Sequence, residues 1–151
     1  MGLLIFLVIL AVLIAGPIMS KKFGKTQDEV NNRLISVIIQ NYEDLANGAT
    51  LDYNGTPINR YSQLTRYRYC YSLISVTCSR SSALYLAEGT SENEEAKNAK
   101  LTCQLITALS GWWGIPWGIF HSIQFLISNG AKNGTNDETV GNIMQRMSNA
   151  A

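Results

Sequence analysis

This 151-residue chain contains three neighbouring carboxylates whose spacing could support acid–base chemistry. Glu92, Glu94 and Glu95 lie close together, and paired carboxylates can act as a general acid and a general base. They stand in a polar run over 88–100 with no adjacent histidine, and acids precede lysines, which suits a short helix or loop. We therefore interpret this run as a solvated face.

The single histidine and the three cysteines are the other reactive side chains. His121 lies in an apolar segment, where an ionisable residue is a candidate for handling protons or a metal, although a hydrogen-bonded packing role is favoured. Cys70 and Cys78 do not have the spacing of a zinc site. In one continuous strand they would lie about 26 Å apart, too far for a disulfide, so we interpret them and Cys103 as small apolar fillers.

Arginines interleaved with tyrosines raise the question of nucleic-acid binding. Arg66 and Arg68 alternate with Tyr67 and Tyr69, and basic residues beside aromatic ones can bind single strands. The net charge of the chain is only +1, whereas nucleic-acid binders carry a basic surplus, so we expect no nucleic-acid partner. The chain also has no catalytic triad, phosphate loop or metal-ligand cluster in its sequence. We therefore expect no enzymatic activity, no cofactor and no metal.

The elements that would position these residues begin with an apolar segment, residues 1–20. Residues 3–19 carry no charge, and their insertion into a bilayer is favoured by about 5 kcal/mol. No lysine or arginine precedes them and no A-x-A site follows, so we expect a retained transmembrane anchor rather than a signal peptide. Lys21, Lys22 and Lys25 follow at once, which predicts an outside N-terminus and a cytoplasmic body at a bacterial inner membrane. Pro17 would kink or end the helix.

An amphipathic helix is predicted within residues 21–50. Thr26 and Glu29 fit a capping box at its start, and Gly48 fits a stop at its end. Its apolar positions recur every three or four residues and share one face, which would pack on the following sheet, on a partner or on the membrane surface. We favour protein, and assign four of these residues to partner binding: Leu34, Val37, Ile38 and Tyr42.

A small antiparallel β-hairpin region is predicted over residues 51–100, together with the charged run. Asn54-Gly55 is a strong turn signal. Residues 65–78 alternate and are rich in aromatic and β-branched side chains, which indicates one strand. A turn at 79–82 and a return strand at 83–89 would complete the hairpin.

The segment 101–130 is apolar and is interrupted near its centre by four residues that weaken a helix: Gly111, Gly114, Pro116 and Gly118. Its two halves are each too short to span a bilayer. Tryptophan prefers the headgroup level, so we predict a membrane interface formed by Trp112, Trp113, Pro116 and Trp117, with Lys21 and Lys22 on the anchor. An interfacial or re-entrant helical hairpin is preferred over a segment of which one half crosses obliquely.

A short C-terminal amphipathic helix is predicted over 131–151. Thr135 and Glu138 fit a second capping box. Ile143, Met144 and Met147 form an apolar stripe that we assign to partner binding, although such stripes more commonly pack in a core.

The octapeptide "GWWGIPWG" at 111–118, with "RYRYCYSLISVTCSRSSALYLAEG" at 66–89 upstream, resembles a group of uncharacterised bacterial membrane proteins. These share a Tyr/Arg-rich strand pair, an apolar segment with this octapeptide and a short helical tail. The resemblance covers roughly the last 80 residues. Its relatives often carry a zinc ribbon or helical repeats ahead of this module, where the present chain has an anchor and an amphipathic helix. The resemblance therefore implies a membrane module without implying an activity.

Together these patterns predict a membrane α+β protein. We expect a structural or accessory subunit of a larger membrane assembly, homo-oligomers included, whose partners are the lipid bilayer and other membrane-protein subunits or copies of itself. The alternative is a lipid-sensing or membrane-remodelling module that uses the tryptophan-rich segment as a wedge.

Overall fold

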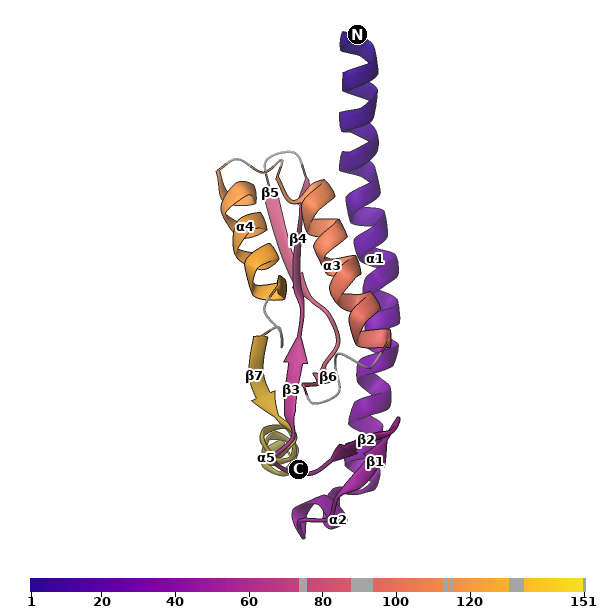
Figure 1. The fold of residues 1–151 in the computed structure, drawn as a ribbon, viewed down its shortest axis with the longest axis vertical. Coiled ribbons are helices and arrows are strands. Elements are labelled where there is room, and N and C mark those ends of the chain that lie inside the picture. Colours follow the sequence, from indigo (N-terminus) through magenta and orange to yellow (C-terminus); the bar gives the residue numbers. More distant parts are fainter. Residues whose placement is uncertain (74–75, 88–93, 113, 115, 131–134, 151) are drawn as a thin grey trace.

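The computed structural model describes residues 1–73, 76–87, 94–112, 114, 116–130 and 135–150. A long N-terminal helix runs along one side of a small α+β body, and its N-terminal half extends beyond the rest of the molecule (Figure 1). The elements in chain order are α1 (Gly2–Gln40), α2 (Tyr42–Ala46), β1 (Leu51–Tyr53), β2 (Thr56–Ile58), β3 (Gln63–Arg66), β4 (Arg68–Leu73), β5 (Val76–Ser81), β6 (Tyr85–Leu86), α3 (Glu94–Ser110), α4 (Trp117–Gly130), β7 (Thr135–Thr139) and α5 (Val140–Ala150).

Helix α1 joins the predicted anchor and most of the predicted amphipathic helix into one continuous element. The capping box expected at Thr26 and Glu29 is wrong, because the Thr26 hydroxyl lies 3.5 Å from the Lys22 carbonyl one turn back, inside the helix. Pro17 also lies within the helix and does not end it. The expected stop at Gly48 is confirmed, since this glycine adopts φ +85° directly after α2, a conformation that only glycine adopts without strain.

The predicted Asn54-Gly55 turn joins β1 to β2 as a two-residue hairpin. Both residues have positive φ, 53° for Asn54 and 80° for Gly55, as a type I′ turn requires. Tyr53 therefore pairs with Thr56, and the Gly55 amide donates a hydrogen bond of 2.7 Å to Asp52.

The single strand predicted over 65–78 is wrong. The chain reverses between Leu73 and Val76, so β4 and β5 pair antiparallel, and residues 79–81 lie in β5 instead of in a turn. Both faces of β4 are covered, by α1 and α3 and by α4, so its alternation marks two buried faces rather than a half-exposed strand. The reversal also corrects the 26 Å separation of the cysteines, because Cys70 and Cys78 lie on paired strands one position out of register.

Strand β3 pairs with β6 on one side and with β7 on the other. The predicted return strand is reduced to β6, and the predicted capping box at Thr135 and Glu138 is wrong because both residues lie in β7. Helix α5 begins five residues after Thr135, and its first turn is capped by Thr139, whose hydroxyl accepts a hydrogen bond of 3.2 Å from the Asn142 amide.

Two apolar clusters form the core. The first lies among α1, β4 and α3 and centres on three buried tyrosines: Tyr67, Tyr69 and Tyr71. The second joins the end of α1 to β3, β6 and α5, and it contains Leu34, Ile38, Ile143 and Met144, with Tyr42 and Met147 packed at its edge.

The second cluster corrects the predicted partner-binding surface. Leu34 and Ile38 are at most 1 % exposed, and Ile143 and Met144 are at most 7 % exposed, because both amphipathic faces pack into one core cluster with apolar residues of β3 and β6. Each stripe indicates a face that must be buried, but neither indicates which surface buries it. Val37 is half-buried and its assignment stays a prediction.

Candidate membrane interface

The N-terminal half of α1 presents apolar side chains to the surroundings. Leu3, Phe6 and Ile14 are 54–73 % exposed, and only 6 % of the most apolar 18-residue window is buried. Among the described residues this is the one helix long and apolar enough to cross a bilayer, judged by length and composition. Membrane anchors and signal sequences share this property.

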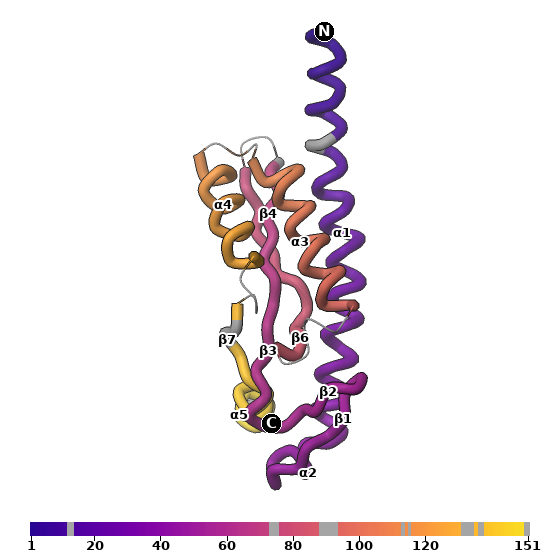
Figure 2. Tube along the Cα trace, viewed as in Figure 1, coloured from indigo at the N-terminus to yellow at the C-terminus, as the bar shows by residue number. Residues whose placement is uncertain are grey.

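The turn between α3 and α4 lies at the end of the body from which this apolar half-helix projects (Figures 1 and 2). A Cβ atom on Gly16 would stand 2.7 Å from the Cβ of Ser110, so the end of α3 is level with Gly16. Lys21 lies five residues further along α1, which is about 8 Å along the helix axis. The predicted interruption of the 101–130 segment is confirmed, since α3 ends at Ser110 and α4 begins at Trp117.

Polar side chains of the β4–β5 hairpin satisfy backbone groups freed at this interruption. The Ser72 hydroxyl donates a hydrogen bond of 2.9 Å to the Gly111 carbonyl and accepts one of 3.0 Å from the Gly114 amide. Ser72 is fully buried, so these bonds replace the water that the backbone would otherwise require. The interruption is thus held by protein contacts.

The described residues of the predicted interface gather at two levels. Trp112, Pro116 and Trp117 lie exposed around the α3–α4 turn, with Trp117 65 % exposed, while Lys21 and Lys22 are exposed on α1. The Trp112 indole donates a hydrogen bond of 2.8 Å to the Ala108 carbonyl, which fixes its ring against α3. Trp113 lies outside the described residues.

Both helices of the pair carry a further apolar row on their outer faces, which the sequence analysis did not single out. On α3 the row is Leu101, Leu105 and Leu109, each 48–55 % exposed. On α4 it is Ile119, Phe120, Ile123 and Ile127, which are 42–70 % exposed. The four-residue spacing is a signal that could have revealed these rows, because residues four apart share a helix face.

His121 packs among aromatic rings on α4. Its ring stacks on Phe125 at a centroid distance of 5.7 Å and lies edge-on to Phe120 at 5.9 Å. Its Nδ1 atom is buried and has no hydrogen-bond partner in the described part of the chain. Packing among aromatic rings is therefore confirmed for His121, while its Nδ1 makes no hydrogen bond to the described residues.

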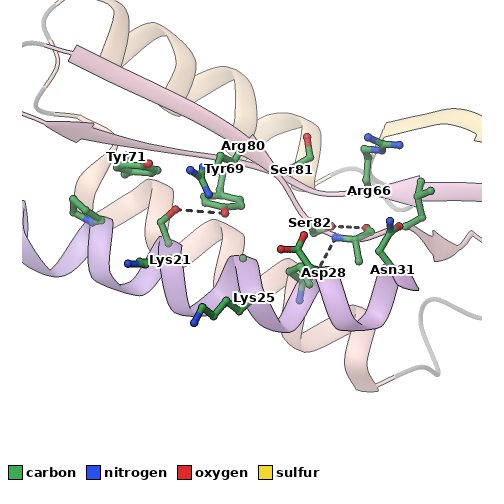
Figure 3. Close-up of a pocket in the computed structure, with 16 residues that line it drawn as sticks. Lys21, Lys25, Asp28, Asn31, Arg66, Tyr69, Tyr71, Arg80, Ser81 and Ser82 are labelled. Atoms are coloured by element: carbon green, nitrogen blue, oxygen red, sulfur yellow. Dashed lines mark hydrogen bonds between the residues drawn. The ribbon is translucent and has the colours of Figure 1, made fainter. Parts of the chain in front are cut away.

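A polar groove of about 730 Å³ lies between α1 and the β4–β5 hairpin. Ser20, Lys21, Gly24 and Lys25 line it on α1 (Figure 3). Tyr69, Tyr71 and Arg80 line the opposite wall. Arg66 and Asp28 stand nearer its other end (Figure 3).

Asn129 joins the end of α4 to β4 by pairing with both backbone groups of Arg68. Its side-chain oxygen accepts a bond of 3.0 Å from the Arg68 amide, and its nitrogen donates one of 2.5 Å to the Arg68 carbonyl. The side chain is 1 % exposed.

Asn129→Ala is therefore expected to destabilise the protein by about 2 kcal/mol, because the backbone amide and carbonyl of Arg68 lose their partner in a buried site. Urea unfolding in detergent measures this, with the exposed Asn149→Ala as control; equal stability of the two variants would contradict the bridging role.

The three cysteines are free, and they differ in accessibility. Burial raises the pKa of the Cys103 thiol to about 12 and also raises the pKa of Cys70, whereas Cys78 is partly exposed. Only the thiolate reacts readily, so at about pH 9 Cys78 is expected to be alkylated first, and Cys70 and Cys103 only after unfolding. Mass spectrometry after maleimide treatment checks this order; early modification of Cys103 would contradict the packing around α3.

Comparison with known protein families, with curated proteins and with solved structures finds no match to this chain. The class that the structure defines is an α+β protein with a long apolar N-terminal helix, small antiparallel sheets and C-terminal helices. Within the described residues no group of three histidine, cysteine or acidic side chains could hold a metal ion. The features available for function are the exposed apolar surface and the polar groove beside it.

Proposed function

We propose that this protein is a small integral membrane protein that acts as a structural or accessory subunit of a larger membrane assembly. Helix α1 crosses the bilayer, and the α3–α4 turn inserts into the leaflet beside it. The observation that carries the proposal is the shared direction of two exposed apolar features: the projecting half of α1 and the tryptophan-bearing turn.

The geometry supports a shallow insertion of the α3–α4 turn. With Lys21 at the headgroup level, the end of α3 reaches about 8 Å into the bilayer, within the roughly 5–10 Å to which interfacial elements insert. Trp112 and Trp117 then lie where the indole ring is buried in the leaflet. The excess of lysines after α1 supports an outside N-terminus and a cytoplasmic body at a bacterial inner membrane.

The apolar rows on α3 and α4 are longer than this insertion. Leu101 lies about 12 Å from Leu109 along α3, and Ile127 lies a similar distance from Ile119 along α4. Lipid covers the part of each row near the turn, and the remainder would stay in water. The i, i+4, i+8 leucines of α3 form a ridge of the kind that packs into the groove of another helix. We therefore propose that the end of the α3 row away from the turn, at Leu101, packs against a helix of another subunit or of a second copy.

The test is the size and composition of the particle that tagged protein forms in mild detergent. We expect a complex larger than the 16.7 kDa monomer, and loss of that complex in Leu101→Lys, while membrane retention is unchanged. Lys97→Gln is the control for a change of charge, because it alters an exposed position one turn before Leu101 on the same helix and leaves all three leucines in place. A monodisperse monomer for the unaltered protein would overturn the subunit role.

The second candidate is a membrane wedge, and the exposure of Trp112 and Trp117 at the turn favours it. A wedge in one leaflet enlarges that leaflet and favours smaller vesicles. Full-length protein reconstituted into neutral liposomes should then reduce vesicle diameter, and replacing both tryptophans by alanine should abolish the effect. An unchanged diameter with the unaltered protein would remove this function and leave the subunit role standing.

A further inference from the structure

We propose that the polar groove between α1 and the β4–β5 hairpin binds the phosphate of an anionic lipid headgroup. This inference rests on the proposed membrane location. It adds a ligand site to a protein whose other surfaces suggest only packing against lipid or protein.

The groove lies beside the part of α1 where the apolar segment ends and the lysines begin. The groove begins at Pro17, within the last apolar turn, and continues past Ser20 to Lys21 and Lys25. If residues 3–19 cross the hydrocarbon, this stretch stands at the level of the lipid phosphates. A lipid seated there would keep its acyl chains beside the apolar half of α1, with Pro17 and Tyr71 lining the adjacent end of the groove.

The charged side chains that line the groove are mostly positive. Lys21, Lys25 and Arg80 are among the residues that line the groove, and the one carboxylate among them is Asp28. Arg66, near the other end, is paired with Glu138 at 2.7 Å. Within the described chain no ion pair involves Lys21, Lys25 or Arg80, so these three cations are available to an anion. A groove lined by one sign of charge attracts the opposite sign.

Arg80 of β5 lies close to α1. A Cβ atom on Gly24 would lie 3.7 Å from Arg80 Nη1, so the guanidinium reaches across the groove to the backbone of α1. In Figure 3 it stands beside Tyr69, whose phenol oxygen lies 3.5 Å from the Ser20 hydroxyl. The wall below it is buried and firmly packed, with Ser20 and Tyr69 each 1 % exposed. A planar guanidinium at this position can bind two phosphate oxygens, while the lysines supply point charges.

The experiment uses full-length protein in neutral detergent, titrated with dioctanoyl phosphatidic acid and followed by native mass spectrometry. Binding should be tighter than for dioctanoyl phosphatidylcholine. Arg80→Gln should weaken it about fivefold, and the triple change of Lys21, Lys25 and Arg80 to glutamine about a hundredfold. Lys22→Gln is the matched control, because Lys22 neighbours the groove without lining it and should change affinity little.

Two outcomes would overturn the inference. Equal binding by the triple variant and by Lys22→Gln would mean that the groove is not the site. Inorganic phosphate binding as tightly as phosphatidic acid would assign the groove to a free anion instead of a lipid. Both outcomes are distinct from failure of the proposed function, because alkaline extraction of the same variants reports membrane insertion independently.

Discussion

Replacing Leu10 and Ile14 of α1 by arginine is expected to move the full-length protein from the membrane pellet to the supernatant of an alkaline carbonate wash. Both side chains are exposed, 42 % and 54 %, so neither supports the folded body. Exchanging a leucine or isoleucine for arginine at the centre of a membrane helix costs roughly 3–4 kcal/mol, so two exchanges cost about 7 kcal/mol. This exceeds the roughly 5 kcal/mol that favours insertion of residues 3–19.

The matched control is the double change of the same residues to alanine, which keeps the segment uncharged and should leave the protein in the pellet. The order of cysteine alkylation in each variant shows whether the body remains folded, because Cys103 is buried far from both substitutions. A folded arginine variant that stays in the pellet would show that α1 is not the crossing element. The α3–α4 turn would then have to hold the protein alone.

Local signals predicted local structure well in this chain. The Asn54-Gly55 turn and the stop at Gly48 need only a residue that tolerates positive φ, and both are found as expected. The interruption between α3 and α4 was predicted for another local reason: Pro116 lacks an amide hydrogen and its neighbouring glycines weaken a helix. These features depend on a few adjacent residues.

Features that depend on which surfaces meet were not predictable from one sequence. The alternation around Tyr67, Tyr69 and Tyr71 indicates strand, but not that the chain reverses after Leu73 and buries both faces of β4. The stripes containing Leu34 and Ile143 indicate faces to be buried, but not that both are buried in one cluster with β3 and β6. Capping signals at Thr26 and Thr135 were overridden because a longer helix and a strand at these positions gain more from tertiary packing than a cap supplies.

The candidate site also has one part that follows from local sequence and another that depends on tertiary packing. The glycines and Pro116 predicted the turn around which Trp112 and Trp117 lie, whereas the membrane interface inferred from tryptophan preference stays a prediction. The polar groove was not predicted, because Lys21 and Arg80 are far apart in the sequence and line one groove only through the packing of the β4–β5 hairpin against α1.

Gly118→Ala is expected to destabilise the protein, although the same change at Gly130 in the same helix is expected to be neutral or stabilising. A Cβ atom on Gly118 would lie 2.5 Å from the Gly111 carbonyl and 3.2 Å from the Ser72 hydroxyl. The first contact is with backbone, which cannot rotate away, so α4 must separate from the α3 end. Overpacking of this kind costs about 1–3 kcal/mol, more than the alanine preference of a helix returns.

Gly130 is the matched control because a Cβ atom there meets nothing within 4 Å among the described residues. Gly130→Ala should gain up to about 1 kcal/mol by restricting the unfolded chain. Thermal unfolding of the full-length variants in detergent compares them, and a loss of 2 kcal/mol corresponds to about 4–8 °C for a chain of this size. If the Gly118→Ala and Gly130→Ala variants unfold at the same temperature, α4 does not approach the end of α3 as closely as described. The Ser72 bonds to Gly111 and Gly114 would then no longer explain how the interrupted backbone is satisfied in this buried site.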